Sequence, residues 1–403
     1  MRNNIRNKIC VVNFYIIIKS NFTVIADTTG IFVAVNFCVQ IAADFILSFV
    51  IDRLKWRPLI CAACVLSIAG YVLYGLLPYI FPENKMFAGI ILATVIFSLA
   101  GGALEVLLSP IIDNIPDGMG RAKPAAMALL HSFYAWGQVF CVVAASVFIL
   151  TAGYANWNFV PIFMALVPLA ALICFLKCPI EKREPPPKGA KEKRKVFKSG
   201  FFIVALVAIA LGGGSEVMMN QYVSTFAELG LGFDKATADL AGMAMFAIAL
   251  GAGRALYGAF GQKTNINKVL ITGSALAVGG YLLAGLSGVP IISLVAGILC
   301  GLFTSLLWPG TLVSVSARFK TGGAWMFAAL AVAGDVGAAA IPAAGGALAE
   351  VLGLNLAFVI TAAIPALCCL CHIFLHKKSK DFNRLFASDK IINGAIESGG
   401  NAQ

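Results

Sequence analysis

Charged residues are scarce in this sequence. They make up 12% of its 403 residues, whereas soluble globular chains have about 25% charged residues. Hydrophobic residues make up 60%, whereas soluble globular chains have about 45–50%. This composition excludes a disordered chain, a coiled coil, a small disulfide scaffold and an ordinary cytosolic enzyme. The sequence also lacks a glycine-rich loop that ends in Gly-Lys-Ser or Gly-Lys-Thr, so it gives no support to ATP-driven transport.

Long apolar stretches are abundant, and they predict an all-α membrane protein. A spanning helix needs about 20 apolar residues. Eleven stretches of this kind lie at about 29–50, 58–80, 86–112, 122–151, 157–176, 200–227, 236–260, 268–287, 290–316, 322–349 and 353–375. An earlier stretch, Ile9 to Ile18, would cover about 15 Å as a helix, half of the roughly 30 Å hydrocarbon layer. We interpret it as the second half of a first helix whose beginning is absent.

The basic residues indicate the topology. When loops are assigned to alternate sides of the membrane, 27 of the 30 Lys and Arg residues fall on one side, and Lys19, Lys85 and Lys235 fall on the other. Because basic loops stay in the cytoplasm, we expect both termini there, in a multi-pass protein of the bacterial plasma membrane. This placement accounts for the net charge of +11, and we expect no nucleic-acid partner.

The chain divides into two similar halves. The stretch GALEVLLSP at 102–110 parallels GLFTSLLWP at 301–309. We predict an N-terminal bundle at 1–176 with an incomplete first helix, a cytoplasmic linker at 177–199, a C-terminal bundle at 200–376 and a cytoplasmic tail at 377–403. Parallel repeats of six spans indicate two bundles that rock about a cavity at the middle of the membrane.

Polar side chains recur at helical spacing within several of these stretches. They fit a water-filled cavity, and the stripe on 122–151 includes an aromatic ring that suits sugar hydroxyls, with Trp308 as the candidate stacking platform. We assign solute binding to Asn36, Gln40, His131, Tyr134, Gln138, Glu216, Asn220, Gln221 and Trp308. Hydrogen bonding between helices is the alternative explanation for part of this set. Three glycines at 212–214 predict a break or bend in the helix that carries Glu216.

Ionisable residues inside the apolar stretches need a function or a partner, because each costs at least about 2.5–3.5 kcal/mol at the middle of a bilayer. The set is Asp44, Glu105, His131, Glu216 and Asp335. We interpret Asp335 as a second coupling group or as the partner of a basic residue such as Arg254.

Two patterns look like cofactor sites, and we reject both. Cys368 to His372 matches the Cys-x-x-Cys-His haem-attachment pattern, but it lies near the cytoplasmic end of the last span, whereas c-type haem is attached on the other side. His372 and His376 have the spacing of a zinc pair, but they have no acidic neighbour and a lysine pair follows them. We expect no metal site, no cofactor and no enzyme activity.

The loop between the stretches at 29–50 and 58–80 resembles a family signature. Asp52-Arg53-Leu54-Lys55-Trp56-Arg57 is similar to the motif Gly-x-x-x-Asp-Arg-x-Gly-x-Arg of the major facilitator superfamily of secondary transporters, with Ser48 and Lys55 in place of its glycines. The segment from Gly253-Arg254 onward resembles the degenerate second copy of this motif. The resemblance implies two six-helix bundles in pseudo-twofold parallel repeat. It also implies that Asp52, Arg53, Arg57 and Arg254 lock the cytoplasmic helix ends in one conformation.

Within this superfamily, the segments around Glu105, His131, Glu216 and Trp308 resemble the fucose-permease-like sugar group and its uncharacterised bacterial relatives. In fucose permeases a glutamate in the corresponding Glu-x-x-x-x-Pro setting is linked to proton coupling, so the resemblance implies this role for Glu105. That group usually has an asparagine near the position of Tyr134, and its absence here argues against fucose itself as the solute.

These observations together predict a monomeric secondary transporter in the lipid bilayer. It would move a small polar solute, such as a sugar, by alternating access and proton symport, with Glu105 and Asp335 as coupling groups. One alternative keeps the fold but exports amphipathic compounds, with Glu216 or Asp335 as the coupling acid. The other is a transport-inactive membrane sensor or scaffold, which the short first helix leaves open.

Overall fold

The computed structural model describes residues 22–114, 123–178, 180, 195–261, 264–319 and 323–379. The predicted half helix at 9–18, most of the predicted linker and nearly all of the predicted tail lie outside the described residues. In the part that is described, the regular structure is helical throughout, with no β-strand. The prediction of an all-α fold is therefore confirmed.

The helices before the linker are long, as the apolar stretches predict. They are α2 (Phe22–Val50), α3 (Trp56–Ile80), α4 (Met86–Asp113), α5 (Lys123–Ala152), and α6 (Phe159–Met164) with α7 (Leu166–Lys177). After the linker come α9 (Gly200–Leu231), α10 (Lys235–Asp239), the π-helical turn η4 (Leu240–Ala244), α11 (Met245–Phe260), α12 (Ile266–Leu286), α13 (Pro290–Thr304), α14 (Leu307–Arg318), α15 (Ala324–Leu352), α16 (Leu354–Thr361) and a last helix at 363–379. Within the described residues, 11 helical segments have the length and hydropathy to cross a membrane, which confirms the predicted spans.

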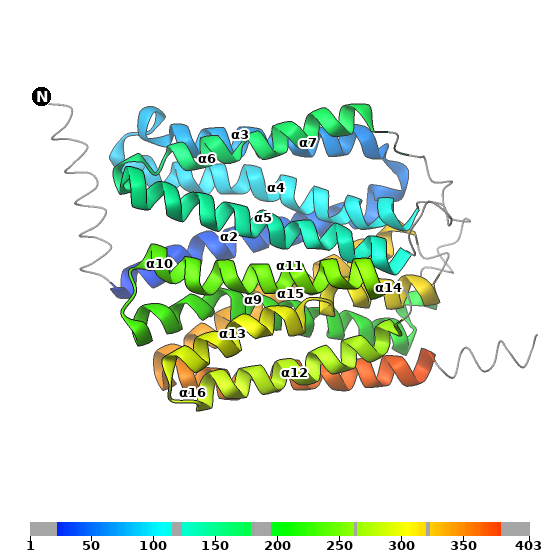
Figure 1. The fold of residues 1–403 in the computed structure, drawn as a ribbon. Helices are drawn as coiled ribbons and strands as arrows, with labels where there is room; N and C mark the ends of the chain where they lie inside the picture. Colours follow the sequence, from blue (N-terminus) through cyan, green and yellow to red (C-terminus); the bar gives the residue numbers. More distant parts are fainter. Residues whose placement is uncertain are drawn as a thin grey trace, which may run out of the picture.

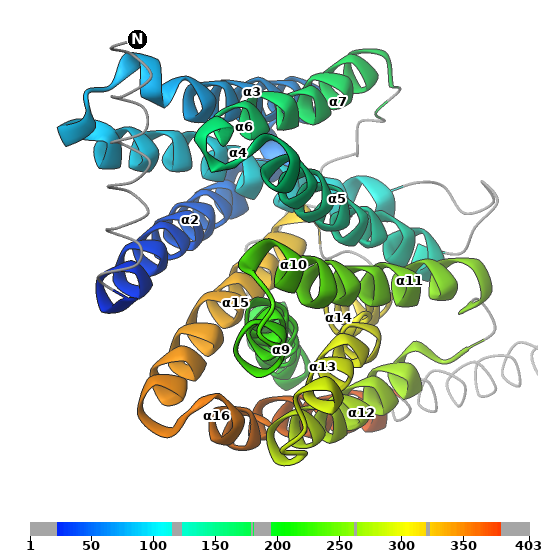
Figure 2. The same cartoon turned by 60° about the vertical axis from the view of Figure 1, so that its left-hand side comes forward.

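The helices lie in two groups. Figure 2 shows α2 to α7 in one group and α9 to α16 in the other, with the long axes of the helices running between the same two ends of the molecule in Figure 1. The groups meet along a seam where α5 packs against α11 and α2 packs against α15. Any space between the two groups is therefore bordered by these four helices.

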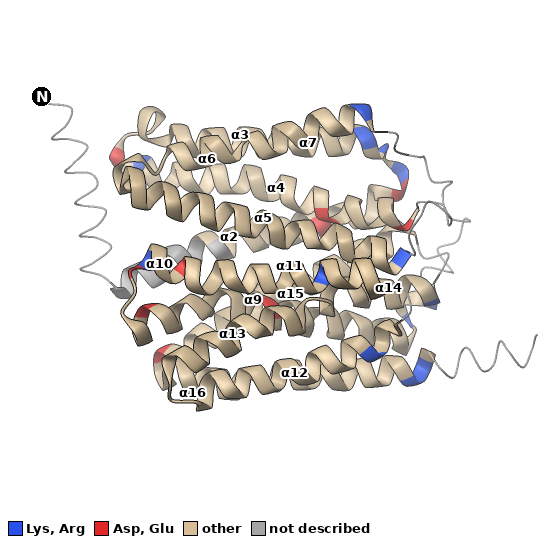
Figure 3. Ribbon diagram, in the orientation of Figure 1, with Lys and Arg blue, Asp and Glu red and all other residues tan. Residues whose placement is uncertain are grey.

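Basic side chains gather at one end of the bundle. In Figure 3 most blue positions lie at the right-hand ends of the helices, near the start of α3, the ends of α7 and α14 and the end of the last helix. We call this the basic end, and we define it by Arg53, Lys123, Lys177, Arg318 and Lys377. The charge distribution found in the sequence is thus a real asymmetry of the folded protein.

The prediction of a break at residues 212–214 is wrong. Helix α9 continues through these glycines from Gly200 to Leu231. A Cβ atom added to Gly214 would lie 2.2 Å from Ile341 Cδ1, and one added to Gly213 would lie 2.7 Å from the Trp308 ring. These glycines therefore allow α14 and α15 to pack closely against α9, and they do not interrupt the helix.

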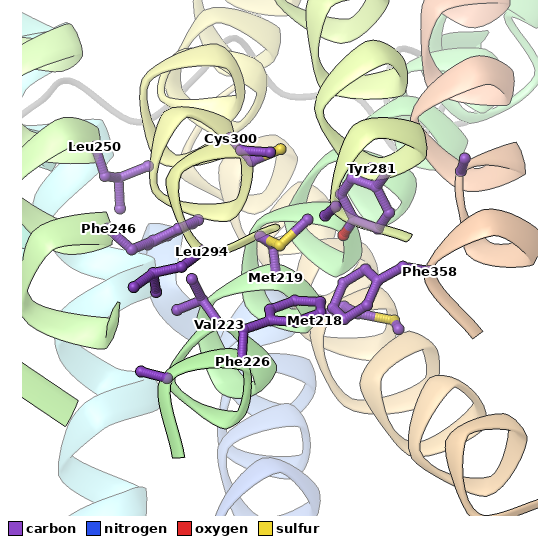
Figure 4. Close-up of a cluster of buried hydrophobic side chains, with 14 of the residues drawn as sticks. Met218, Met219, Val223, Phe226, Phe246, Leu250, Tyr281, Leu294, Cys300 and Phe358 are labelled. Carbon is purple, nitrogen blue, oxygen red and sulfur yellow. The ribbon is translucent and has the colours of Figure 1, made fainter. Parts of the chain in front are cut away.

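The C-terminal group has a well-packed apolar core. Figure 4 shows Met218, Met219, Val223 and Phe226 of α9 surrounded by side chains from neighbouring helices, among them Phe246, Tyr281, Leu294, Cys300 and Phe358. All of these side chains are buried. Helix α9 is therefore held in place over its length, and this fixes the positions of its polar residues.

Candidate functional site

Arg254 is a buried charge on helix α11. Its side chain is 2% exposed, and its Nη2 atom donates hydrogen bonds to Glu216 Oε2 at 2.7 Å and Oε1 at 2.9 Å on α9. The suggestion that Arg254 is the ionic partner of Asp335 is therefore wrong, because its partner is Glu216. An arginine in a membrane requires such a partner. Arg254 lies within α11, and its role in the conformational lock stays a prediction.

The hydrogen bond from Arg254 to Ser305 depends on a proline. Pro309 has no N–H to donate to the carbonyl of Ser305, four residues earlier, and the helix is interrupted between α13 and α14 at this point. Arg254 Nε donates to that free carbonyl oxygen at 2.7 Å. The interruption thus provides an acceptor that a continuous helix would have used itself.

Arg254 also reaches across the seam. Its Nη1 donates to the backbone carbonyl of His131 on α5 at 3.0 Å, and its guanidinium carbon lies 5.7 Å from the centre of the Tyr134 ring. One turn further along α5, Gln138 Nε2 donates to Asn220 Oδ1 at 2.8 Å. We call Arg254, Glu216, Tyr134, Gln138 and Asn220 the seam cluster. It brings polar groups of both helical groups together, and Tyr134 remains exposed beside it.

The other residues that the sequence assigned to solute binding lie elsewhere. Asn36 Oδ1 accepts a hydrogen bond from Ser98 on α4 at 2.7 Å. His131 has its imidazole 3.2 Å from Ser109 Oγ, also on α4. Trp308 packs against Gly213 and Gly334, where an added Cβ would touch its ring. Gln221 makes no side-chain hydrogen bond with any other described residue. Two of these side chains thus bond between neighbouring helices, and the structure adds nothing to the predicted role of the other two.

Three carboxyl groups converge where α2, α4 and α15 meet. Asp44, Glu105 and Asp335 each place a carboxylate oxygen within 4.8 Å of the other two. Gln40 Nε2 donates to Glu105 Oε2 at 2.7 Å. We call Asp44, Glu105 and Asp335 the acidic cluster. The sequence singled out Glu105 and Asp335 as coupling groups without predicting that they lie together. It placed Asp44 with Asn36 and Gln40 on a polar helix face that lines a cavity, and it assigned Asp44 no part in coupling.

The acidic cluster is the one group of three potential metal ligands among the described residues. Cys368, Cys371 and His372 do not form such a group there. The predicted absence of a metal site stays a prediction. A cation could bind here only when these carboxyl groups are ionised.

The two helical groups are in contact at the basic end. Asp52 Oδ1 accepts a hydrogen bond from the backbone N–H of Ala324, at the start of α15, at 3.2 Å. Beside this bond, Ile51 and Cys64 share a buried apolar cluster with Ala324 and Ala328. A carboxylate at a helix N-terminus is electrostatically favourable. Asp52 therefore lies where the predicted lock would act.

The arginines of the predicted lock differ in their contacts. Arg57 donates to the carbonyl of Cys178, just after α7, so it joins two helices of the same group. Arg53 makes no hydrogen bond or ion pair within the described part of the chain. The contact across the seam at this end is therefore made by Asp52.

Open spaces lie toward the opposite end. A crevice of about 310 Å³ separates α5 from α10, bordered by Ser146 and Tyr154 on one side and Lys235 and Asp239 on the other. A larger hollow of about 640 Å³ follows α5 from Trp136 to Thr151, and its lining is mainly apolar. The two groups are thus in contact at the basic end, and the crevice between α5 and α10 lies toward the opposite end of the seam.

A comparison with protein families explains this architecture. The model of the Major Facilitator Superfamily matches residues 7–267 and again residues 231–390, and these two matches overlap. The chain belongs to the Major Facilitator Superfamily. The predicted membership of this superfamily is thereby confirmed. The superfamily and the relatives described next consist of transporters, so the chain is a multi-pass membrane protein of a transporter family and not an enzyme.

Members of the Major Facilitator Superfamily with related sequences or folds are known. A glucose/galactose transporter of Brucella abortus biovar 1 (strain 9-941) is 21% identical over 356 residues, which are 83% of this chain and 82% of that protein. Among solved structures, the transporter FucP in its outward conformation has a TM-score of 0.69 at 14% identity, over 86% of this chain and 89% of that one. The proton:xylose symporter XylE has a TM-score of 0.68 at 15% identity, over 85% of each chain. At these identities the structural matches show the fold.

Proposed function

We propose that this protein is a secondary active transporter that carries a sugar across the bacterial plasma membrane by alternating access, as a monomer coupled to protons. The observation that carries the proposal is the seam cluster. Polar side chains of α5, α9 and α11 meet between the two helical groups, at the middle of otherwise apolar helices. A solute bound there would contact both groups and would move from one side to the other when they rock.

The chemistry of the seam cluster supports a sugar as the solute. Gln138 and Asn220 supply amide donors and acceptors, and Tyr134 supplies an exposed ring beside a guanidinium. Sugar hydroxyls need such paired donors and acceptors, and a sugar ring can stack on an aromatic face. Relatives described as a glucose/galactose transporter and as a proton:xylose symporter support the same class of solute.

The proposed direction is inward. Because basic loops stay in the cytoplasm, we assign the basic end to the cytoplasmic side, with both termini there. The contact at that end and the spaces at the opposite end then correspond to a state open to the outside. Glu105 and Asp335 lie about 12–16 Å from the basic end along their helices. On this proposal they take up a proton that enters from the outside.

Uptake by purified protein in vesicles tests this function. We expect labelled glucose, galactose or xylose to accumulate when the outside is acidic, and to exchange without accumulating when no gradient is imposed. Glu83→Gln, which changes an exposed acid between α3 and α4, serves as a matched control and should behave like the wild type. Absence of both accumulation and exchange for a panel of aldoses would contradict the proposal.

The hollow along α5 favours a second candidate, the export of amphipathic compounds. Its lining includes Trp136, Phe140, Val143 and Val147, which suit an apolar solute better than a sugar. Under this alternative, an apolar dye would accumulate inside inside-out vesicles in a proton-dependent way, and sugars would not compete with it. Competition by an excess of sugar would favour the first candidate.

A further inference from the structure

We propose that Asp44, Glu105 and Asp335 together form the site of the coupling proton, and that closure of the two helical groups assembles this site. The inference rests on the proposed function, and it assigns Asp44 a role equal to that of Glu105 and Asp335. Asp44 and Glu105 belong to the N-terminal group, on α2 and α4, and Asp335 belongs to the C-terminal group, on α15. The site therefore extends across the seam.

Asp44 is buried without a hydrogen-bond partner. Its side chain is 0% exposed, and neither of its carboxylate oxygens has a partner among the described residues. Oδ2 of Asp335, which is 3% exposed, likewise has none. Buried polar atoms are almost always hydrogen-bonded, so these oxygens point to a missing binding partner. The partner must lie between them, because the carboxylate oxygens approach one another within 4.8 Å.

The room for Asp44 is made by a glycine. A Cβ atom on Gly102 of α4 would lie 2.6 Å from Asp44 Oδ1. Any other residue at this position would push the carboxyl group away from Glu105, which follows three residues later on the same helix. The small-residue run that lets α2 and α4 approach closely is thus part of the site.

The missing partner must carry positive charge. Within the described residues, no basic side chain bonds to the acidic cluster, and the nearby Arg254 is already paired with Glu216. Tyr134 and His131 lie on α5, which packs against α4, but the His131 imidazole lies beside Ser109 and Tyr134 lies beside Arg254, so neither bonds to the acidic cluster. Three ionised carboxylates at this separation repel one another strongly away from water. One or more of them must therefore hold a proton.

A proton held there joins the two helical groups. When a hydronium ion on the open side gives its proton to one carboxylate and leaves as water, the new O–H can donate to a carboxylate oxygen on the other side of the seam. The bond formed is O–H, and the hydrogen bond then holds α15 against α2. When the basic end opens, the acceptor moves away, the O–H bond breaks and the proton leaves to the cytoplasmic water. Binding of the proton and closure of the basic end are thus one event.

The reactivity of Cys64 measures closure directly. This cysteine is 1% exposed and lies in the apolar cluster at the basic end with Ala324 and Ala328. In a variant with Cys64 as the only cysteine, we expect maleimide labelling in detergent to be slower at pH 6 than at pH 8. A difference of about tenfold is reasonable for one hydrogen bond between the groups. This labelling measurement does not require a solute.

Substitutions in the acidic cluster give opposite results. In Asp44→Asn an amide N–H replaces the shared proton, so labelling should be slow at both pH values. In Asp335→Ala no hydrogen bond can form across the seam, because Asp335 is the only member of the acidic cluster from the C-terminal group, so labelling should be fast at both pH values. Glu83→Gln, at an exposed position between α3 and α4, should keep the full pH dependence. Thermal unfolding of each variant, measured in parallel, shows whether it is folded.

Two results would overturn the inference. One is an unchanged pH dependence of labelling in folded Asp44→Asn and Asp335→Asn variants. The other is a labelling rate that responds to sodium ions at constant pH and not to protons, which would make the acidic cluster a sodium site. If the wild type exchanges no sugar but Cys64 labelling follows pH as expected, the proposed solute is wrong and the proton site stands.

Discussion

Arg254 shows how a single buried charge organises the site. Its guanidinium contacts Glu216, the carbonyl of Ser305 and the carbonyl of His131, so one side chain joins α9, α13 and α5 through α11. A buried ion pair with all its donors satisfied adds little to stability compared with apolar residues, but loss of one partner leaves an uncompensated charge. The pair is therefore better understood as a device that positions polar groups at the seam.

Removal of one partner of this pair should be much worse than removal of both. We expect Glu216→Gln or Arg254→Gln to destabilise the protein by about 3–5 kcal/mol, and the double variant to be considerably more stable than either. Thermal unfolding in detergent measures the effect. Lys235→Gln, which breaks the exposed pair with Asp239, is the control and should change stability by less than about 1 kcal/mol. Single variants as stable as this control would contradict the interpretation.

Glu105 should separate accumulation from exchange. Glu105→Gln keeps the shape of the side chain but cannot release a proton, so coupling should be lost while solute still crosses. We expect vesicles with this variant to exchange labelled sugar at a rate near that of the wild type, without accumulation under a proton gradient. Accumulation equal to that of the wild type would show that Glu105 carries no coupling proton.

At the scale of the helices, the close packing of α9 against α15 depends on glycine. A Cβ on Gly337 would lie 1.9 Å from the carbonyl oxygen of Ala210, and helix backbones cannot move apart locally without loss of neighbouring contacts. This pair of helices carries Glu216 on one side and Asp335 on the other. The distance between the seam cluster and the acidic cluster is thus set by small residues.

Gly337→Ala should therefore destabilise the protein, by about 1–3 kcal/mol as expected for overpacking. Gly279 on α12 provides a matched control, because nothing lies within 4 Å of an added Cβ there. Gly279→Ala should be neutral or stabilising by up to about 1 kcal/mol, since alanine is the better helix former. Melting temperatures of the two variants in the same detergent compare the effects directly, and equal temperatures would contradict the packing argument.

The elements themselves were largely predictable from the sequence. Eleven apolar stretches correspond to eleven helical segments, because a spanning helix requires a length and hydropathy that the sequence shows directly. The glycines at 212–214 were misinterpreted, because glycine weakens a helix in water but permits close helix contact in a membrane protein. The interruption between Thr304 and Leu307 was not predicted, although Pro309 marks it.

At the scale of the whole molecule, the two ends of the seam differ. The basic end is joined by the Asp52–Ala324 hydrogen bond and an apolar cluster, while the crevice between α5 and α10 lies at the opposite end. On the proposed orientation this is the state that receives solute from outside. Asp52 then acts on the balance between this state and the one open to the cytoplasm.

Asp52→Ala should shift that balance toward opening at the basic end. Loss of one hydrogen bond between the groups should raise the rate of Cys64 labelling by up to about tenfold. Cys300, buried in the core of the C-terminal group, is the control: in a variant with Cys300 as the only cysteine, Asp52→Ala should not change the labelling rate. Equal increases at both cysteines would indicate general unfolding, and no increase at Cys64 would exclude Asp52 as part of a lock.

The sequence by itself determined the class of protein, the membrane spans, the asymmetry of basic charge and the family. These properties depend on composition, on runs of neighbouring residues and on a short motif, so they are readable along the chain. Only the tertiary structure decided which charges meet. Arg254 pairs with Glu216, 38 positions away, and Asp52 contacts Ala324, 272 positions away. Asp44 gained a role only beside Asp335, because contacts between distant helices depend on packing that no local pattern records.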